Sequence, residues 1–470
     1  MFGLALAALT LLRLLVAAVT PLSPDEAYYW VWSRALAPGY LDHPPMVAFW
    51  IRAGTTIAGD SDLGIRLLAP LAAAAGSLLL ADAGRILFDR RTGLLAALLM
   101  NATLLFGVGS VTMTPDTPAL FFWTAAIWSL ARLRANPNWW LAAGACTGLA
   151  LDSKYTAALL LPAIFLWLLT PAMRPWLRRL QPWLALAIAA VLFAPVILWN
   201  ADHDWASFAK QAGRTDAWRP ARALQFEGEL LLGQLGLATP IIAVLCAAGA
   251  VAALRRWRDP AWSLLAACTA VPALVFLQHA LGDRVQANWP AILYPSAALA
   301  AAALTGIWQR LAMPGIALGL ALTALVWLQA ATGFLPLPMR ADPTLLRLGG
   351  WDGLAASIAT HPAAYIAAEN YGQAALLARL LPSDIPVLGI EARWALFDLP
   401  NGRPDVAGKP GLLLRSTRRD GGPDPNDWSD IREIARIDRS RHGMTAEGFR
   451  LYHVIGRADG APIAVMPRKP

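Results

Sequence analysis

Long apolar segments are the feature that most limits what this chain can fold into. Crossing a bilayer takes about 20 mostly apolar residues, because every backbone amide must be bonded within the helix. We read eleven such spans, near residues 2–20, 64–81, 93–111, 115–131, 139–151, 155–170, 182–199, 230–253, 261–281, 288–308 and 314–334. The two spans between residues 139 and 170 are short and meet at Asp152-Ser153-Lys154. Such a polar break is typical of half-helices that line a cavity.

Charge density divides the chain near residue 334. Only 38 of the first 334 residues are charged, against 32 of the remaining 136, and ordinary soluble domains carry about 25% charged residues. We therefore predict an all-α polytopic membrane domain over residues 1–334 and a soluble domain over residues 335–470. This pattern excludes a cytosolic enzyme, a disordered protein and a disulfide-stapled secreted scaffold.

The arginines predict the orientation in the membrane. With eleven spans and a cytoplasmic N-terminus, one set of short loops holds Arg85, Arg90, Arg91, Arg132, Arg134, Arg174, Arg178, Arg179, Arg255, Arg256, Arg258 and Arg310. Cytoplasmic loops are enriched in this way. The opposite face receives 13 of the 16 acidic residues of residues 1–334. It also carries the loop 21–63 and the C-terminal domain, which in a bacterial inner membrane would be periplasmic.

The loop 21–63 carries the densest polar motif of the external face. It contains Pro-Leu-Ser-Pro-Asp-Glu-Ala-Tyr-Tyr-Trp from residue 21 and Asp-His-Pro-Pro from residue 42. Ser23 and Glu26 predict a capping box. An amphipathic helix on the membrane surface should follow over residues 25–37, with Tyr29, Trp30 and Trp32 as interfacial anchors. In the alternative interpretation, Asp25 and Glu26 are only first-turn acids that favour the helix dipole.

Four further external breaks hold polar groups against the membrane. They are Thr114-Pro115-Asp116, Asp152-Ser153-Lys154-Tyr155, Asn200 to Trp205, and Asp283 to Pro290. Carboxylates beside basic groups suit a site that binds phosphate and deprotonates a hydroxyl. Lys154 is a candidate because a Lys at a membrane helix break is costly without a partner. Asp116 fits either a site or an ordinary helix start. Arg13, inside the first span, fits either a functional role or a structural one, in which it snorkels to the membrane surface or pairs with a neighbouring helix.

These segments resemble the bacterial family-39-type glycosyltransferases, which are related to protein O-mannosyltransferases and lipid A aminoarabinose transferases. The resemblance rests on PLSPDEAYYWVWSRALAPGYLDHPPMVAFWI, MTPDTPALFFW, LDSKYTA, WNADHDWASF and RVQANWP, in the family's order across residues 1–334. It extends more loosely into residues 365–380. It implies a GT-C fold, that is, a polytopic helical membrane enzyme with a polyprenyl-phosphate-linked sugar as donor.

The resemblance also implies roles for residues of the first loop. Asp25 and Glu26 match the family's catalytic acidic pair, and Tyr28 belongs to the same motif. Asp42 matches a carboxylate before a Pro-Pro pair. The next residue is a Lys near the donor phosphate in the aminoarabinose transferases, and it is His43 here.

Two later segments match as well. His203 matches a histidine that, with the Asp42 position, is expected to hold a divalent metal in that relative. Lone histidines at a membrane surface are also often merely interfacial, which applies to both His43 and His203. Arg284 to Pro290 matches a basic and aromatic break in which Asn288 stands where the family has a Lys.

The implied reaction is an inverting displacement at the anomeric carbon. Asp25 would take the proton of an acceptor hydroxyl, and cations would offset the charge that develops on the leaving lipid phosphate. The predicted donor-binding residues are His43, Lys154, Arg284 and Asn288. Asp42 and His203 are the candidate ligands of a divalent metal. Asp116 and Tyr28 complete the predicted site. No nucleotide-binding glycine motif is visible, so we expect no nucleotide cofactor. The acceptor would be lipid A, a glycan, a lipid or a protein.

Two rival functions are a transporter or lipid flippase and a non-catalytic membrane scaffold. Transporters commonly contain internal repeats with matching broken helices, but the motifs of the first loop do not recur downstream. A scaffold would leave the polar breaks without a purpose. No Lys/Arg run with interleaved aromatics indicates a nucleic-acid partner.

The C-terminal domain is predicted to be a small α/β domain. Residues 365–368 suit a strand, residues 373–381 a helix and residues 387–390 a second strand. Residues 423–428 form a turn-rich excursion.

Overall fold

The computed structural model describes residues 2–213, 218–399, 406–457 and 464–468. The chain divides into two compact units, each of which is discontinuous in sequence. The first unit comprises Met1–Leu14, Pro38–Val47 and Leu68–Leu325, and the second comprises Leu15–Ala37, Ala48–Leu67 and Val326–Pro470. The division predicted at residue 334 rests on charge and hydropathy, and it stays a prediction.

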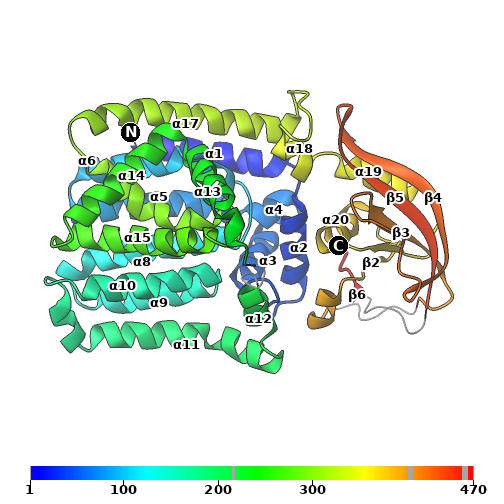
Figure 1. Ribbon diagram of the computed structural model, residues 1–470, viewed down its shortest axis with the longest axis horizontal. Helices are drawn as coiled ribbons and strands as arrows, with labels where there is room; N and C mark the ends of the chain where they lie inside the picture. Colours follow the sequence, from blue (N-terminus) through cyan, green and yellow to red (C-terminus); the bar gives the residue numbers. More distant parts are fainter. Residues whose placement is uncertain (1, 214–217, 400–405, 458–463, 469–470) are drawn as a thin grey trace. The chain divides into compact units, whose positions relative to one another are not determined.

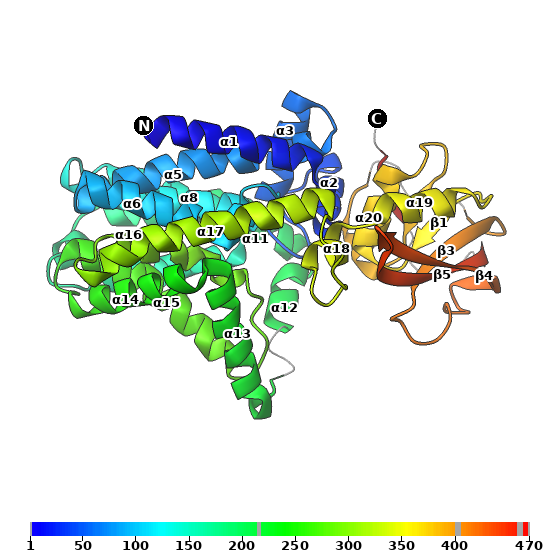
Figure 2. The same cartoon turned by 90° about the horizontal axis from the view of Figure 1, so that it is seen from above.

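The first unit is helical, and its first and last α-helices continue into residues 15–19 and 326–332 of the second unit. Its α-helices are α1 (Phe2–Val19), α5 (Leu68–Leu87), α6 (Arg90–Asn101), α7 (Leu104–Gly109), α8 (Asp116–Ala131), α9 (Trp139–Leu151), α10 (Leu160–Leu168), α11 (Gln181–Asp202), α12 (Ala206–Ala212), α13 (Ala223–Ala238), α14 (Pro240–Arg255), α15 (Pro260–Ala280), α16 (Tyr294–Ala302) and α17 (Ile307–Thr332). Short 3₁₀ helices are η1 (Arg132–Arg134), η2 (Tyr155–Leu159), η3 (Arg174–Arg178), η5 (Pro220–Arg222) and η6 (Trp289–Leu293). Most of these α-helices run roughly parallel to one another, whereas α13 leaves their common direction (Figures 1 and 2).

Within the described residues, five helical segments are long and apolar enough to cross a membrane. They are Phe2–Val19, Asp62–Leu87, Gln181–Asp202, Pro260–Ala280 and Ile307–Thr332. They coincide with or overlap the predicted spans 2–20, 64–81, 182–199, 261–281 and 314–334. The other predicted spans correspond to shorter or interrupted helices, so the count of eleven and the orientation stay predictions.

The predicted span over residues 230–253 is interrupted. The segment is two helices, α13 and α14, which bend by 109° at their junction. Thr239 has a positive φ of 69° there, and Pro240 begins α14. Because proline has no N–H and its ring clashes with the preceding turn, α13 cannot continue through it.

Arg13 pairs with a neighbouring helix, as one of its two interpretations expects. The residue is fully buried in α1, and its Nη2 donates to Oδ1 of Asn101 at 2.8 Å. Asn101 in turn donates to the hydroxyl of Ser77 at 2.8 Å. This polar chain links α1, α6 and α5 inside the helical unit.

The second unit combines three helices from the first loop with the C-terminal domain. The helices are α2 (Pro24–Arg34), α3 (Met46–Ala58), α4 (Asp62–Arg66), α18 (Pro343–Leu348), α19 (Trp351–Ala359), α20 (Tyr371–Leu380) and the 3₁₀ helix η7 (Ala392–Leu396). The strands are β1 (Ile366–Ala368), β2 (Val387–Gly389), β3 (Pro410–Ser416), β4 (Trp428–Arg441), β5 (Met444–Gly456) and β6 (Ala464–Val465). The predicted strand–helix–strand sequence is confirmed by β1, α20 and β2.

These strands form one sheet in the order β4-β5-β3-β1-β2-β6. The strand β1 is parallel to both β2 and β3, and the outer pairs are antiparallel. The buried residues of β1, Ile366 to Ala368, belong to the apolar centre of this sheet. The tail therefore has the predicted α/β character.

The long hairpin of β4 and β5 was not predicted (Figure 1). Its loop is His442-Gly443, and both residues have positive φ, 50° and 77°. Such two-residue loops match the twist of the paired strands. The sequence of β4 contains many charged residues because much of this edge strand is exposed. The strand therefore lacks the apolar residues by which a strand is usually recognised in a sequence.

A buried carboxylate anchors this hairpin to the end of α17. The side chain of Asp342 is 3% exposed and pairs with Arg441 of β4 at 3.0 Å. It also accepts hydrogen bonds from Gln329 at 2.7 Å and from the Thr344 hydroxyl at 2.6 Å. Burial alone would raise the pKa of Asp342, but hydrogen bonds from Thr344 and Gln329 outweigh it and hold that pKa below its usual value.

We expect Asp342→Ala to destabilise the second unit by about 3–5 kcal/mol, because Arg441 would lose the partner of a buried ion pair. A depressed pKa in the folded state gives a contribution that is present at neutral pH and lost as the pH falls through the folded pKa. The difference in thermal unfolding temperature between variant and wild type should therefore be large at pH 7. It should shrink below about pH 4, near the ordinary aspartate pKa. An equal difference at both pH values would contradict this assignment.

Candidate functional site

The predicted capping box begins α2 and is confirmed. The Ser23 hydroxyl accepts from the backbone N of Glu26 at 3.3 Å, and the Glu26 carboxylate accepts from the backbone N of Ser23 at 3.0 Å. Pro24 occupies the first turn of α2, where its missing N–H costs nothing. The local sequence therefore places Asp25 and Glu26 side by side in the first turn of a helix.

The predicted amphipathic surface helix is wrong, because α2 is buried along most of its length. Trp30 and Trp32 are 0% exposed and Tyr29 is 8% exposed, so they are not interfacial anchors. The helix ends at Arg34 and packs against α20 of the C-terminal domain. Apolar and aromatic residues on several faces of a helix suit burial inside a protein as well as a membrane interface.

Glu26 makes a fully buried ion pair with Arg66 of α4. Both side chains are 0% exposed, and Arg66 Nε lies 2.6 Å from Glu26 Oε1. Arg66 Nη2 donates to Glu26 Oε2 at 2.7 Å. The same guanidinium donates to the carbonyls of Ala17, Thr20 and Pro21. Glu26 is therefore occupied in holding the start of α2 in place.

Asp25 is the accessible member of the acidic pair. Its side chain is 41% exposed, and its Oδ1 accepts a hydrogen bond from the Tyr371 hydroxyl at 3.0 Å. Arg347 Nη1 lies 4.0 Å from Asp25 Oδ2. Tyr371 and Arg347, which lie 346 and 322 positions after Asp25 in the sequence, thus reach its carboxylate.

Aromatic and cationic side chains surround Tyr371. The Arg393 guanidinium carbon lies 4.0 Å from the centre of the Tyr371 ring, and the Tyr28 ring is 4.5 Å away. Tyr28 is 2% exposed, and Arg393 Nη1 approaches its hydroxyl at 3.5 Å. Tyr28 therefore contacts the residue that bonds Asp25 rather than facing open solvent.

Arg379 fastens α20 to the first-loop helices. Its guanidinium donates to Asp60 at 2.9 Å and to Asp62 at 3.2 Å, and it lies over the Trp30 ring at 4.7 Å. The Trp30 indole also donates to Asp60 at 2.9 Å. These contacts fix the helix that carries Tyr371 against the helix that carries Asp25.

In the first unit, three predicted site residues meet. Lys154 Nζ lies 2.6 Å from Asp116 Oδ1, and Asn288 donates to Asp116 Oδ2 at 2.8 Å. Lys154 is 5% exposed, whereas Asn288 is exposed. The helix break before η2 places Lys154, the first turn of α8 places Asp116, and η6 follows Asn288. Lys154 thus has the partner that a lysine at such a break requires.

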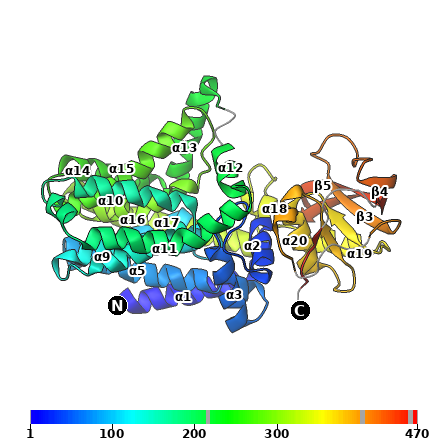
Figure 3. The same ribbon diagram turned by 90° about the horizontal axis from the view of Figure 1, so that it is seen from below.

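Asp42 also pairs with a lysine. Lys210 Nζ of α12 lies 2.6 Å from Asp42 Oδ1, and Gln211 donates to the Asp42 carbonyl at 2.8 Å. Figure 3 shows α11 leading into α12. Lys154 and Lys210 are the two lysines of residues 1–334, and each pairs with a predicted site aspartate.

The histidines and Arg284 have separate surroundings. His203 stacks on Trp199, with ring centres 4.1 Å apart, and its Nδ1 donates to the Trp199 carbonyl at 2.8 Å. His43 is half-buried in the loop before α3. Arg284 is largely exposed and pairs with Glu229 of α13 at 2.6 Å.

The residues present do not fit the metal predicted at Asp42 and His203. Asp42 faces Lys210, and the described residues contain no group of three or more His, Cys, Asp or Glu side chains placed to hold a metal ion. Metal sites in proteins use about three or more such ligands or a set of oxygen donors. No step proposed below uses a metal.

Asp152 adds a titratable group beside Lys154. It lies in the break between α9 and η2, and its carbonyl accepts from the backbone N of Met46 at 3.0 Å. Burial raises the pKa of its carboxyl to about 7. Asp152 therefore changes its charge near neutral pH.

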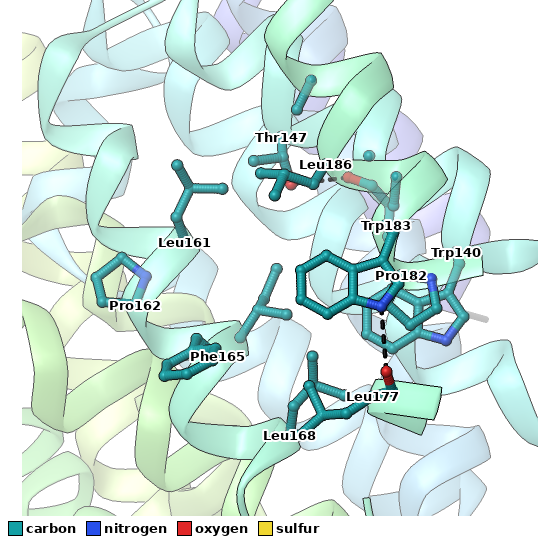
Figure 4. Close-up of a pocket in the computed structure, with 15 residues that line it drawn as sticks. Trp140, Thr147, Leu161, Pro162, Phe165, Leu168, Leu177, Pro182, Trp183 and Leu186 are labelled. Carbon is teal, nitrogen blue, oxygen red and sulfur yellow. Dashed lines mark hydrogen bonds between the residues drawn. The ribbon is translucent and has the colours of Figure 1, made fainter. Parts of the chain in front are cut away.

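An apolar cavity of about 340 Å³ lies elsewhere in the first unit. Figure 4 shows Leu161 and Phe165 of α10 facing Trp183 of α11, whose indole donates to the Leu177 carbonyl at 3.1 Å. None of its lining residues is ionisable, and none is a predicted site residue. This cavity is therefore not the candidate active site.

Sequence reasoning missed several partners of the predicted residues. Arg66 carried a usable signal, because it is an arginine inside the predicted span 64–81, and intramembrane arginines are functional candidates by default. Lys210 was recognisable as one of only two lysines in the membrane part. Tyr371 and Arg347 carried no local signal, since only tertiary contacts bring them to Asp25.

We expect Arg66→Ala to lower the free energy of unfolding by about 3–5 kcal/mol, because Glu26 would remain buried without its partner. Thermal unfolding of the purified chain in detergent measures this loss. Arg52→Ala, which removes an exposed arginine of α3, is the matched control and should change stability by less than about 0.5 kcal/mol. Equal stability of the two variants would refute the anchoring role of Arg66.

Comparison with known proteins adds independent information. Residues 42–199 match the model of the dolichyl-phosphate-mannose-protein mannosyltransferase family. The chain is also 32% identical over 279 residues to the lipid A galacturonosyltransferase RgtD of Rhizobium johnstonii. That match covers 57% of this chain and 58% of the relative, so it spans less than two thirds of either protein.

Solved structures show the fold. ArnT from Cupriavidus metallidurans, bound to undecaprenyl phosphate, superposes with a TM-score of 0.66 at 14% identity over 98% of this chain and 99% of that one. Its apo form gives a TM-score of 0.62, also at 14% identity, over 98% of each chain. The chain therefore has the GT-C fold of ArnT, and the resemblance to family-39-type membrane glycosyltransferases that its loop motifs predict is confirmed.

Proposed function

We propose that this protein transfers a sugar from a polyprenyl-phosphate donor to an acceptor hydroxyl at the outer face of a bacterial inner membrane, with inversion at the anomeric carbon. The observation that carries the proposal is the state of the acidic pair. Glu26 is buried and fully engaged, whereas Asp25 is 41% exposed, accepts a hydrogen bond from the Tyr371 hydroxyl and lies 4.0 Å from Arg347. A general base must be able to reach the proton that it abstracts.

In this reaction Asp25 takes the proton of the acceptor hydroxyl through Oδ2 as that oxygen attacks the anomeric carbon. The carbon–oxygen bond to the acceptor forms while the bond from the anomeric carbon to the phosphate oxygen breaks. The leaving polyprenyl phosphate keeps the electron pair. Tyr371 donates to Oδ1, and Arg347, 4.0 Å from Oδ2, lies beyond hydrogen-bond distance, so we assign the proton transfer to Oδ2.

The charge on the leaving phosphate requires fixed cations, because preorganised positive groups stabilise developing negative charge. Lys154 and Lys210 are held in place by Asp116 and Asp42, and Asn288 contributes an amide donor on the same aspartate as Lys154. These residues are our candidates for the donor phosphate site, together with His43 and Arg284. Held lysines lose little freedom when a phosphate binds.

The relatives indicate the substrate class. ArnT binds undecaprenyl phosphate in the matched structure, and the relative from Rhizobium is a lipid A galacturonosyltransferase. We propose a polyprenyl-phosphate-linked sugar as donor and a lipid A type glycolipid as acceptor, both in the periplasmic leaflet. The relatives reported above are transferases, so the transporter alternative gains no support from them.

The proposal is tested with purified protein in detergent or liposomes. Polyprenyl phosphates carrying radiolabelled galacturonic acid, aminoarabinose or mannose are offered with lipid A as acceptor, and transfer is followed by thin-layer chromatography and mass spectrometry. We expect one of these donors to support transfer. Failure of all three donors with folded protein would argue against the proposed donor and acceptor class.

Asp25→Asn should lower the rate of transfer by about 10²–10⁴-fold, which is the usual contribution of a general base. Expression and thermal unfolding should stay close to wild type, since Asp25 is partly exposed. Asp352→Asn, an exposed first-turn acid of α19, is the matched control and should keep full activity. Full transfer by the folded Asp25→Asn variant would exclude Asp25 as the base.

Tyr371→Phe should lower kcat about tenfold and leave KM unchanged, because the lost bond is a hydrogen bond to a charged group that orients the base. Tyr452→Phe removes a hydroxyl that donates to Glu433 in the sheet and should leave both constants unchanged. A rise in KM with normal kcat would show instead that Tyr371 acts in substrate binding.

A further inference from the structure

A second cavity lies between α6 and α17, and none of its lining residues is a predicted site residue. Its volume is about 490 Å³, and it is lined by Arg90, Arg91, Leu94, Leu95, Leu98, Gln309, Ala312 and Met313. All of these residues belong to the first unit. The lining therefore changes from arginine to leucine along α6, over about 12 Å between positions 90 and 98 at 1.5 Å per residue.

The groove is closed at one end, where α17 packs against residues that follow α6, and it is open at the other. A Cβ atom on Gly319 of α17 would lie 1.9 Å from the carbonyl oxygen of Ala102, just after α6. Gly107 of α7 likewise leaves no room for a Cβ beside Thr323, the nearest atom being at 2.4 Å. Ten residues before Gly319, at Gln309, the helices line the groove instead of meeting.

The open end of the groove is strongly basic. Arg90 and Arg91 are exposed, and neither forms an ion pair or a side-chain hydrogen bond within the described part of the chain. Arg310, next to Gln309, is exposed as well. Asp89, which precedes Arg90, caps α6 by accepting from the backbone N of Thr92 at 2.8 Å, and its single negative charge also interacts with Arg91. A net positive charge therefore remains beside an apolar channel.

This arrangement matches the chemistry of one class of molecule. We propose that the groove binds an anionic glycerophospholipid of the leaflet at the arginine-rich end, which the arginine pattern assigns to the cytoplasm. The lipid phosphate contacts Arg90 and Arg91, and the Gln309 amide lies beside the polar glycerol region. One acyl chain runs over Leu94, Leu98 and Met313.

Charge complementarity decides between the available lipids. Each arginine or lysine near the surface of an anionic leaflet contributes about 1 kcal/mol of attraction, or roughly a fivefold gain in binding. A zwitterionic lipid with the same chains fills the same apolar channel but carries a compensating cation that the arginines repel. Basic pockets between transmembrane helices recognise anionic headgroups for this reason. The proposal does not depend on the transfer reaction.

Native mass spectrometry of the full-length protein tests it. The purified, delipidated chain is titrated with phosphatidylglycerol or phosphatidylcholine of identical acyl chains, and the retained lipid is counted. We expect one tightly retained phosphatidylglycerol with at least about fivefold preference over phosphatidylcholine. The double variant Arg90→Gln/Arg91→Gln should reduce this preference to less than about twofold.

Two further variants distinguish the contribution of the lipid headgroup to binding from that of the acyl chain. Arg178→Gln/Arg179→Gln removes two adjacent exposed arginines outside the groove and should keep the wild-type preference. Met313→Trp fills the apolar channel and should weaken both lipids, even if the arginine double variant proves too unstable to purify.

Three results would overturn the proposal. The first is equal retention of the two lipids by wild type, and the second is an unchanged preference in the Arg90→Gln/Arg91→Gln variant. The third is displacement of phosphatidylglycerol by an equimolar amount of undecaprenyl phosphate, which would assign the groove to a polyprenyl lipid.

Discussion

The buried pair of Glu26 and Arg66 is the interaction on which the candidate active site depends. One guanidinium binds both carboxylate oxygens and three carbonyls at the end of α1 and the loop before α2. Because an unpaired charge at this depth is strongly unfavourable, the rotation of α2 about its axis is fixed. Adjacent residues of a helix point about 100° apart. Fixing Glu26 inward therefore leaves Asp25 as the carboxylate that a substrate can reach.

The C-terminal domain contacts the proposed base directly. Its helix α20 is held against the first-loop helices by Arg379 and presents Tyr371 to Asp25. Tyr371 is in turn held between Tyr28 and Arg393. If Asp25 is the base, as proposed, this domain would orient it, which is a more specific role than covering the site. The lipid groove between α6 and α17 concerns a different part of the chain and a different ligand.

Several features followed from local sequence because local contacts decide them. The capping box of Ser23 and Glu26, the strand and helix pattern of residues 365–390 and the loop motifs were all readable in this way. The predictions failed where a pattern fits two environments. The aromatic residues of α2 suit a membrane interface and a protein interior equally, and the apolar run of residues 230–253 hides a break at Pro240. The charged edge strand β4 also carried no clear strand pattern.

The sequence by itself determined that the chain is a polytopic membrane protein that resembles glycosyltransferases. The length and spacing of its apolar segments and the order of its five polar motifs can be read without knowing how the helices pack. The sequence also named Lys154 as a candidate, since a lysine at a membrane helix break is costly without a partner. Asp25 and Asp42 became candidates through the resemblance of the first loop to a known family. Only the tertiary structure decided which aspartate is accessible and which lysine each of the others holds. It also brought Tyr371 to Asp25 across 346 positions of sequence. Such contacts depend on how separate helices pack, and no local pattern of residues encodes that packing.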